Sequence, residues 1–279
     1  MAKFSKLNNK RRQEMRELFI IMVVVLLVSF SNVVFAVEEE AARITMEELK
    51  KRNIEVNFSS KVLSKSVGDA GTVFYNRSVV ENELTITHTP SGVYLEIWVS
   101  TSLKNAGVST NYGNEIDYTL GWAGEVAGIG IDAGVSYWDI ATLFESPEGD
   151  IVQPYLELNK KFDIIEEGHT LTPSIKAEYG IPAKGNDVGS KGLHMHTALK
   201  HNWEISKDFS INHQVEMVYD YGAYGADKAL IGAYEVCPSY VVADWLSLDA
   251  SAKVISPLTK VDDGRKTEWI YGGGVTFSF

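Results

Sequence analysis

The sequence predicts an all-β protein, a transmembrane antiparallel up-and-down β-barrel of about 12 strands. From residue 54 onward, apolar and polar residues alternate with a period of two, as in strands that have one apolar face. Short turns alternate with longer connections rich in Gly, Pro, Asn and Asp, which is typical of bacterial outer-membrane barrels. No apolar stretch after Ala36 approaches the length of a membrane-spanning helix, so any membrane span must use strands.

Residues 1–36 have the features of a secretory signal peptide. A basic region from Lys3 to Arg16 precedes an unbroken apolar run from Leu18 to Val28. A helix needs about 20 apolar residues to cross a bilayer, so this run is too short for a stable anchor. Val34-Phe35-Ala36 supplies a small-residue cleavage point, which predicts cleavage after Ala36 and export in a Gram-negative bacterium. The alternative is an uncleaved inner-membrane anchor.

Residues 37–53 are charged and are expected to form a periplasmic N-terminal lead-in with a short amphipathic helix. This segment either leads into the barrel without further contacts or docks at the barrel mouth or on a partner. Residues 54–279 are expected to form the barrel.

Composition narrows the possible partners and stabilising bonds. The formal net charge is −11 at pH 7, and the predicted signal contains six of the 26 Lys and Arg residues. The rest of the chain has no basic cluster that could displace counterions from phosphates, which argues against nucleic acid as a partner. Cys237 is the only cysteine, so no internal disulfide can form and closure of the barrel has to stabilise the fold.

The alternation predicts strands of roughly 10 to 14 residues. The clearest pair is joined by Ala127-Gly128, a tight hairpin with a well-defined register. The predicted strands span residues 54–65, 78–89, 92–103, 114–126, 129–140, 151–163, 169–181, 191–205, 208–221, 228–240, 244–255 and 267–279. An even number of strands with short periplasmic turns places both termini in the periplasm, and the longer connections, including 66–77, are then extracellular loops.

The last strand ends in a pattern of aromatic residues and glycine. Tyr271, Gly274, Phe277 and the final Phe279 resemble the recognition signal that is read by the outer-membrane barrel assembly machinery. Expected partners are therefore this machinery, periplasmic chaperones, and the lipid and lipopolysaccharide of the outer membrane. The main competing fold is a soluble periplasmic sandwich or a lipocalin-like barrel, which would bury its apolar face.

Three segments resemble the TorF family of outer-membrane porins: Ser91 to Ser100, Gly113 to Tyr118 and the glycine-containing hairpin 124–138. The resemblance is clearest over residues 75–162. The first strand departs from the family pattern, because Val62-Leu63-Ser64-Lys65 stands where the family has an aromatic-Arg-Gly ending. The resemblance implies a porin-type barrel of the bacterial outer membrane and brings no catalytic residues.

If the apolar face contacts lipid, the opposite face lines the lumen, and its charged residues are mostly acidic. The predicted pore-lining residues are Glu96, Glu115, Asp117, Asp132, Trp138, Glu157, Lys176, Glu178, His194, His196, Lys200 and Glu216. An acidic lumen favours cations or neutral polar solutes over anions. The sequence therefore predicts a narrow channel for passive diffusion of small polar solutes. The alternative is a non-conducting structural or surface-interaction barrel, closed by its own salt bridges.

Histidines raise the question of metal binding or catalysis. His194 and His196 share a strand face and could ligate a metal, but the sequence names no third ligand, so neither a metal nor a cofactor is predicted. His201 and His213 are expected to face each other across a turn, on the lipid side. His213-Gln214-Val215-Glu216 lacks the Ser-Asn-Gly motif of the outer-membrane phospholipases, so a hydrolase is a minor alternative and the chain is expected not to be an enzyme.

Overall fold

The computed structural model describes residues 49–103, 115–140, 150–164, 168–183, 191–222 and 226–279. The predicted signal peptide lies outside these residues, as does all of the predicted lead-in except its last five residues, which include a helical turn at 49–51. Among the described residues, no helix is long and apolar enough to cross a membrane.

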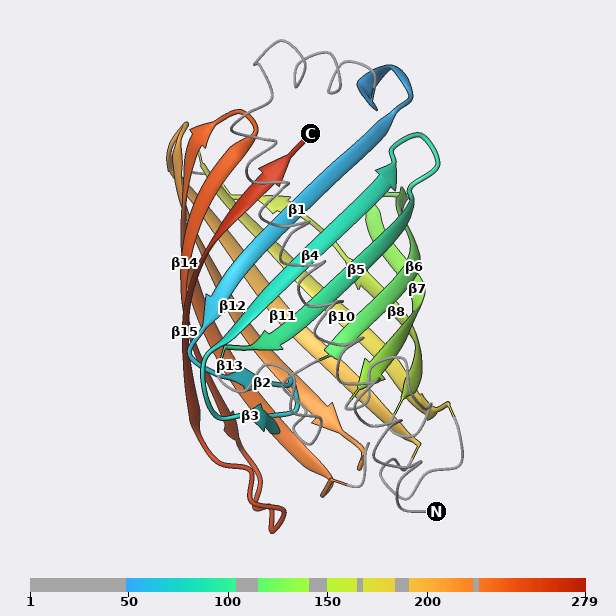
Figure 1. Ribbon diagram of the computed structural model, residues 1–279, viewed down its shortest axis with the longest axis vertical. Helices are drawn as coiled ribbons and strands as arrows, with labels where there is room; N and C mark the ends of the chain where they lie inside the picture. The colour runs from blue at the N-terminus through green and yellow to red at the C-terminus, as the bar shows by residue number, and fades with distance from the viewer. Residues whose placement is uncertain (1–48, 104–114, 141–149, 165–167, 184–190, 223–225) are drawn as a thin grey trace, which may run out of the picture.

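Twelve long antiparallel strands form a closed barrel, which confirms the predicted fold (Figure 1). Each strand pairs with its neighbours in sequence, and the first strand closes the barrel against the last. The barrel strands are β1 (Ile54–Leu63), β4 (Val79–His88), β5 (Val93–Ser102), β6 (Glu115–Val126), β7 (Ile129–Ile140), β8 (Ile151–Asn159), β10 (His169–Pro182), β11 (Gly192–Ser206), β12 (Phe209–Asp220), β13 (Ala229–Ala243), β14 (Leu246–Pro257) and β15 (Glu268–Ser278).

Two details differ from the expected strands. The predicted strand 151–163 is divided into β8 and a short β9 (Phe162–Asp163). The division lies opposite Pro173 of β10, which has no N–H to donate and so interrupts the ladder. In addition, the connection between β1 and β4 contains a small hairpin of β2 (Ser66–Val67) and β3 (Val73–Tyr75), which the alternation did not indicate.

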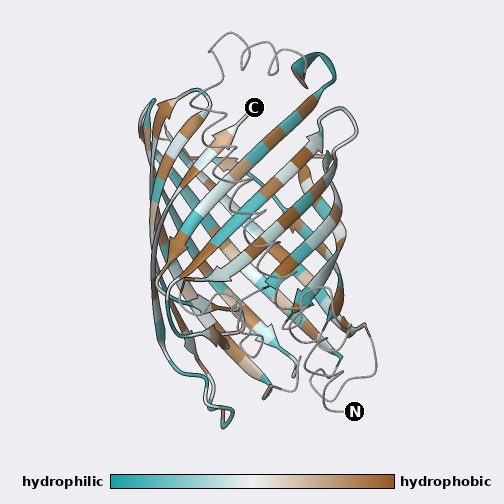
Figure 2. Cartoon of the chain, in the orientation of Figure 1, coloured by the Kyte–Doolittle hydropathy of each residue, from teal (hydrophilic) through white to brown (hydrophobic). Residues whose placement is uncertain are grey.

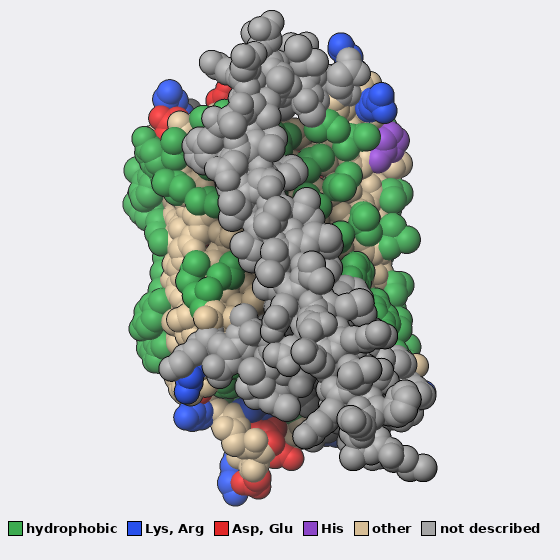
Figure 3. Space-filling model, in the orientation of Figure 1, with side chains coloured by type: hydrophobic (Ala, Val, Ile, Leu, Met, Phe, Trp, Pro, Cys, Tyr) green, Lys and Arg blue, Asp and Glu red, His purple; other side chains and the backbone are tan. Residues whose placement is uncertain are grey.

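The outer face of the barrel is apolar. Hydrophobic and hydrophilic residues alternate along the strands in Figure 2, and Figure 3 shows hydrophobic side chains over much of the visible wall, with charged side chains near its two ends. Leu120, Val126 and Trp269 are each more than half exposed. Exposing apolar surface to water costs about 25 cal/mol per Å², so this outer face suits lipid and argues against the soluble alternative.

Pairing between β1 and β15 closes the sheet. It runs from Asn57 opposite Ser278 to Leu63 opposite Gly272. The backbones of Val56 and Phe279 exchange two further hydrogen bonds, of 3.0 and 2.8 Å. The closed sheet therefore has no free edge between its first and last strands.

The four residues of the predicted assembly signal lie on β15 or directly after it. The ring of Phe277 stacks with Phe58 at 6.2 Å and with Phe279 at 6.4 Å, and the exposed Tyr271 stacks with Trp269 on the outer face. Gly274 points to the inner face, directly opposite Lys61 of β1.

Gly274 is needed for this closure. A Cβ at residue 274 would lie 2.7 Å from the Ser60 carbonyl oxygen and 2.6 Å from Cγ of Lys61, whereas a Cβ at residue 273 would meet nothing nearer than 3.4 Å. We expect Gly274→Ala to lower the free energy of unfolding by about 1–3 kcal/mol through overpacking, and the control Gly273→Ala to have little effect. Urea unfolding of the refolded protein in detergent, followed by tryptophan fluorescence, measures the difference. Equal stability of the two variants would contradict this account.

Candidate functional site

The register places the sequence-predicted pore-lining residues on the inner face of the barrel. Residues directly opposite each other in an antiparallel ladder point to the same side. Lys176 lies opposite both Glu157 and His196, and Glu157 lies opposite Asp132. By the same pairing rule, the remaining members of the set point to the same side of the sheet: Glu96, Glu115, Asp117, Trp138, Glu178, His194, Lys200 and Glu216. The exposed apolar residues occupy the alternate positions.

Charged groups on β10, β11 and β12 form a buried network on this inner face. Glu178 Oε1 lies 3.1 Å from His196 Nε2 and 3.4 Å from His194 Nδ1, while Glu178 Oε2 contacts Lys176 Nζ at 2.6 Å. His196 Nδ1 lies 2.8 Å from Glu216 Oε1. The two-residue period of β11 explains why both histidines reach this network, because residues 194 and 196 share one face.

Arg265 extends the network to the connections at one end of the barrel. Its guanidinium lies 2.7 Å from Asp220 Oδ2 and 2.7 Å from Asp263 Oδ2. It also donates to the carbonyls of Ala70 and Asp227. Arg265 therefore joins the β14–β15 connection to the β1–β4 and β12–β13 connections. Its side chain is only 4% exposed.

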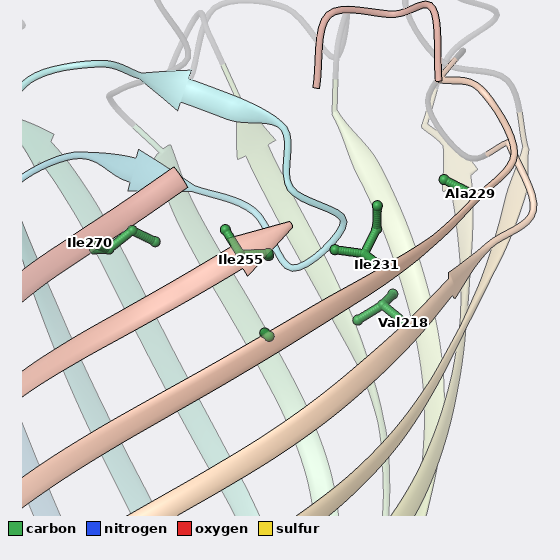
Figure 4. Close-up of a cluster of buried hydrophobic side chains, with 6 residues drawn as sticks. Val218, Ala229, Ile231, Ile255 and Ile270 are labelled. Carbon is green, nitrogen blue, oxygen red and sulfur yellow. The ribbon is translucent and has the colours of Figure 1, made fainter. Parts of the chain in front are cut away.

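The β2–β3 hairpin turns inward at this same end. Its tip, residues 68–71, lies against the inner wall, where Gly71 approaches the side chains of Ile231 and Ile255. These isoleucines belong to an apolar inner-face cluster, shown in Figure 4. The cluster consists of Val218, Ala229, Ile231, Ala233, Ile255 and Ile270, with Leu63, Val67 and Val261 packed against it. We refer to residues 66–75 as the inner hairpin.

Asp69, at the tip of the inner hairpin, forms an ion pair with Lys253 of β14 at 3.6 Å. Partial loss of hydration inside the barrel would alone raise the pKa of the Asp69 carboxyl, but the Lys253 ammonium and the His196 ring outweigh this effect and hold the pKa below its usual value. The inner hairpin is therefore held by apolar packing, by this ion pair and by the bond from Arg265 to the Ala70 carbonyl.

The wall formed by β4, β5 and β6 has a different character. Apart from the exposed Glu125 at the end of β6, this inner face carries five carboxylates that are not ion-paired with any Lys, Arg or His of the described residues: Glu81, Glu83, Glu96, Glu115 and Asp117. Within the same part of the chain, Asp117 Oδ1 is buried and has no hydrogen-bond partner. We call these five residues the acidic wall. Next to it, the hydroxyls of Tyr94 and Tyr155 both donate to Asp132 Oδ1, at 2.8 and 3.2 Å.

Several of these residues were not singled out from the sequence. Glu83 and Asp220 have the same inward parity as the predicted set and could have been found by counting outward from the neighbouring turns. Asp69 and Arg265 lie in connections, where no periodicity indicates direction. The predicted pairing of His201 with His213 is confirmed by the register, and their rings stack at 5.7 Å on the outer face.

Loss of Arg265 should destabilise the end of the barrel where the inner hairpin lies. We expect Arg265→Met to reduce the free energy of unfolding by about 3–5 kcal/mol, because Asp220 keeps a buried charge without its guanidinium partner. Lys260→Met, on the same connection with a side chain 87% exposed, is the matched control. Urea unfolding and limited proteolysis report the loss. If both variants behave like the unmodified protein, Arg265 does not hold these connections together.

The Asp69–Lys253 pair should make the stability of the protein depend on pH. Because the pKa of Asp69 is lowered on folding, its contribution is present at neutral pH and is lost as the pH falls below about 4. The side chain is 53% exposed, so the contribution is at most about 1 kcal/mol. Asp69→Asn should be less stable than the unmodified protein at pH 7, and the difference should shrink as the pH falls below about 4. A pH-independent difference in unfolding midpoints would contradict this.

No family model matches the chain, and no curated protein matches it. Among solved structures, a KdgM porin superposes with a TM-score of 0.50 and 12% identity, over 81% of this chain and 99% of that chain. A NanC porin gives 0.49 and 13%, over 80% and 98%, and an outer membrane channel from Pseudomonas putida F1 gives 0.48 and 12%, over 81% and 94%. At 12% identity the similarity to the KdgM porin bears on the fold alone, and this chain is a 12-stranded barrel similar in fold to that outer-membrane porin.

Proposed function

We propose that the chain is a porin-like channel of the bacterial outer membrane, through which small polar solutes diffuse passively, with cations and neutral solutes preferred over anions. The observation that carries the proposal is the acidic wall. Its carboxylates face the interior without cationic partners among the described residues. A partly dehydrated anion that enters such an interior meets repulsion that nothing nearby offsets, whereas a cation is attracted.

The inner hairpin supports a narrow passage. It lies against β13 and β14, whereas β6 and β7 lie halfway round the closed strand order from those strands. The interior is thus asymmetric, with a hairpin and a buried ion-pair network on one side and carboxylates on the other. A barrel of twelve strands is intermediate in width between side-chain-filled and water-filled barrels, so an inward hairpin narrows any channel further.

The acidic wall also bears on the solute. A KdgM porin has been solved in complex with oligogalacturonate, which is an acidic sugar chain. Carboxylates on the wall would repel such a chain, so the proposed solutes of the present barrel belong to a different class. Membership of the TorF family is part of the same proposal.

The proposal includes delivery to the outer membrane by the signal peptide 1–36 and insertion by the barrel assembly machinery, with Tyr271, Gly274, Phe277 and Phe279 as the recognition signal. Outer-membrane lipid and lipopolysaccharide would then cover the apolar wall. The outward aromatic rings near one end support this, since Phe58, Trp245 and Phe277 stack there as an interfacial aromatic girdle would.

A non-conducting structural barrel is the second candidate. The observation that favours it is the buried network of Glu178, His196 and Glu216 together with the apolar cluster that holds the inner hairpin. Both features fill part of the interior with protein groups, as expected of a barrel whose lumen is blocked.

Conductance of the refolded protein in a planar bilayer distinguishes these functions. We expect stable, cation-selective steps, and we expect the double variant Glu96→Gln, Asp117→Asn to lower the cation-to-anion permeability ratio by roughly two- to fivefold, because two charges leave the wall. Glu125→Gln, an exposed position at the end of β6, is the matched control. A folded, heat-modifiable barrel that never conducts would refute the channel and favour the structural role.

A further inference from the structure

The paired histidines of β11 have a third potential ligand in the structure. Glu178 of β10 lies directly opposite His194 in the ladder and contacts both histidine rings. We propose that Glu178, His194 and His196 bind a divalent transition-metal ion on the inner face of the barrel, with Zn²⁺ as the best match. The site depends on these three side chains and not on whether the barrel conducts.

The spacing of the donor atoms fits one ion. Glu178 Oε1 lies 3.1 Å from His196 Nε2 and 3.4 Å from His194 Nδ1, and ligand atoms of all three residues lie within 4.8 Å of one another. In a tetrahedral zinc site with bonds of about 2.0–2.1 Å, neighbouring ligand atoms are about 3.3 Å apart. Two of the three separations thus already match, and a small movement of the histidine rings completes the set.

Each histidine also faces a carboxylate on its other ring nitrogen. Glu216 Oε1 lies 2.8 Å from His196 Nδ1, and Asp220 Oδ1 lies 3.4 Å from His194 Nε2. A carboxylate that accepts the proton of one ring nitrogen, as Glu216 can from His196 Nδ1, leaves the lone pair of the other nitrogen for the metal and fixes the ring orientation, while Asp220 supplies negative charge beside His194. This arrangement distinguishes the cluster from two histidines that only fill space.

The chemistry of the donors favours a particular class of ion. Two imidazoles and one carboxylate suit Zn²⁺, Ni²⁺ or Cu²⁺, whereas Ca²⁺ and Mg²⁺ prefer oxygen ligands alone. Three protein ligands leave a fourth position for water or a solute group. Lys176 contacts the other carboxylate oxygen, Oε2, so it leaves Oε1 directed at the histidines.

Burial adds to the fit. His194, His196 and Glu178 are each 5% exposed or less. Because water has little access to this site, it screens the attraction between a divalent cation and the nearby carboxylates only weakly. The carboxylates Glu178, Glu216 and Asp220 also outnumber the cationic side chains Lys176 and Arg265.

The test is metal binding by the purified, refolded chain in detergent. Isothermal titration with Zn²⁺ should give one ion per chain, and Co²⁺ should give the intense visible absorption of a tetrahedral site, which Zn²⁺ then removes. Glu178→Gln and His196→Gln should each weaken Zn²⁺ binding by more than about tenfold, and Glu216→Gln by about tenfold, because its carboxylate only orients a ligand. Absence of stoichiometric Zn²⁺ binding to the unmodified protein overturns the proposal.

A second histidine cluster supplies the control. On the outer face, His169 Nδ1 lies 3.0 Å from His201 Nε2, and His201 stacks on His213. His201→Gln should leave Zn²⁺ binding unchanged. Binding that is lost in His201→Gln and kept in His196→Gln would move the site to the outer face and refute the proposal.

Folding of each variant is checked by gel electrophoresis, in which a folded barrel migrates differently before and after heating. If His196→Gln does not fold, His194→Gln tests the same site, and the Co²⁺ spectrum of the unmodified protein gives a result that needs no variant. A spectrum without tetrahedral absorption counts against the site. Conductance is recorded separately, so failure of the channel and failure of the metal site are distinguishable.

Discussion

Closure of the sheet between β1 and β15 is the constraint on which the rest of the molecule depends. Seven residue pairs from Asn57–Ser278 to Leu63–Gly272, with the two bonds between Val56 and Phe279, leave no exposed edge between the first and last strands. Because side chains alternate between faces, a slip of one residue at this seam would exchange the inner and outer faces of the shifted strand. The glycines of β15 set the register by admitting Lys61 and Leu63 at close distance.

With the register fixed, the inner face becomes a place where charge can be buried. Inward residues of β10, β11 and β12 meet in a network of carboxylates, histidines and a lysine, whereas the charged inward residues of β4, β5 and β6 are all carboxylates. Removing charges from water is costly unless they are paired, so the first wall is stabilised internally and the second is suited to mobile counterions. The barrel thus divides one acidic composition into two different surfaces.

Alternation predicted most of this architecture, because a period of two reports both the strand and the direction of its side chains. It could not show the break opposite Pro173, since the proline lies on the neighbouring strand. The inner hairpin could not be predicted either, because its polar and glycine-rich sequence resembles that of any exposed connection. The alternation placed Glu178 on the inner face. Its position beside the histidines depends in addition on the register between β10 and β11. Pairing the two predicted strands symmetrically about residue 186 gives this register.

The position of Arg265 in the sequence sets an order of events for assembly. This residue precedes only β15, yet its guanidinium bonds to the Ala70 carbonyl, which lies between the first two barrel strands. Arg265 can therefore hold the inner hairpin only after all of the barrel strands except β15 have been delivered. Until then the inner hairpin lacks the bond that ties it to the last connection of the barrel, so it is held less firmly in a nascent barrel than in the finished one.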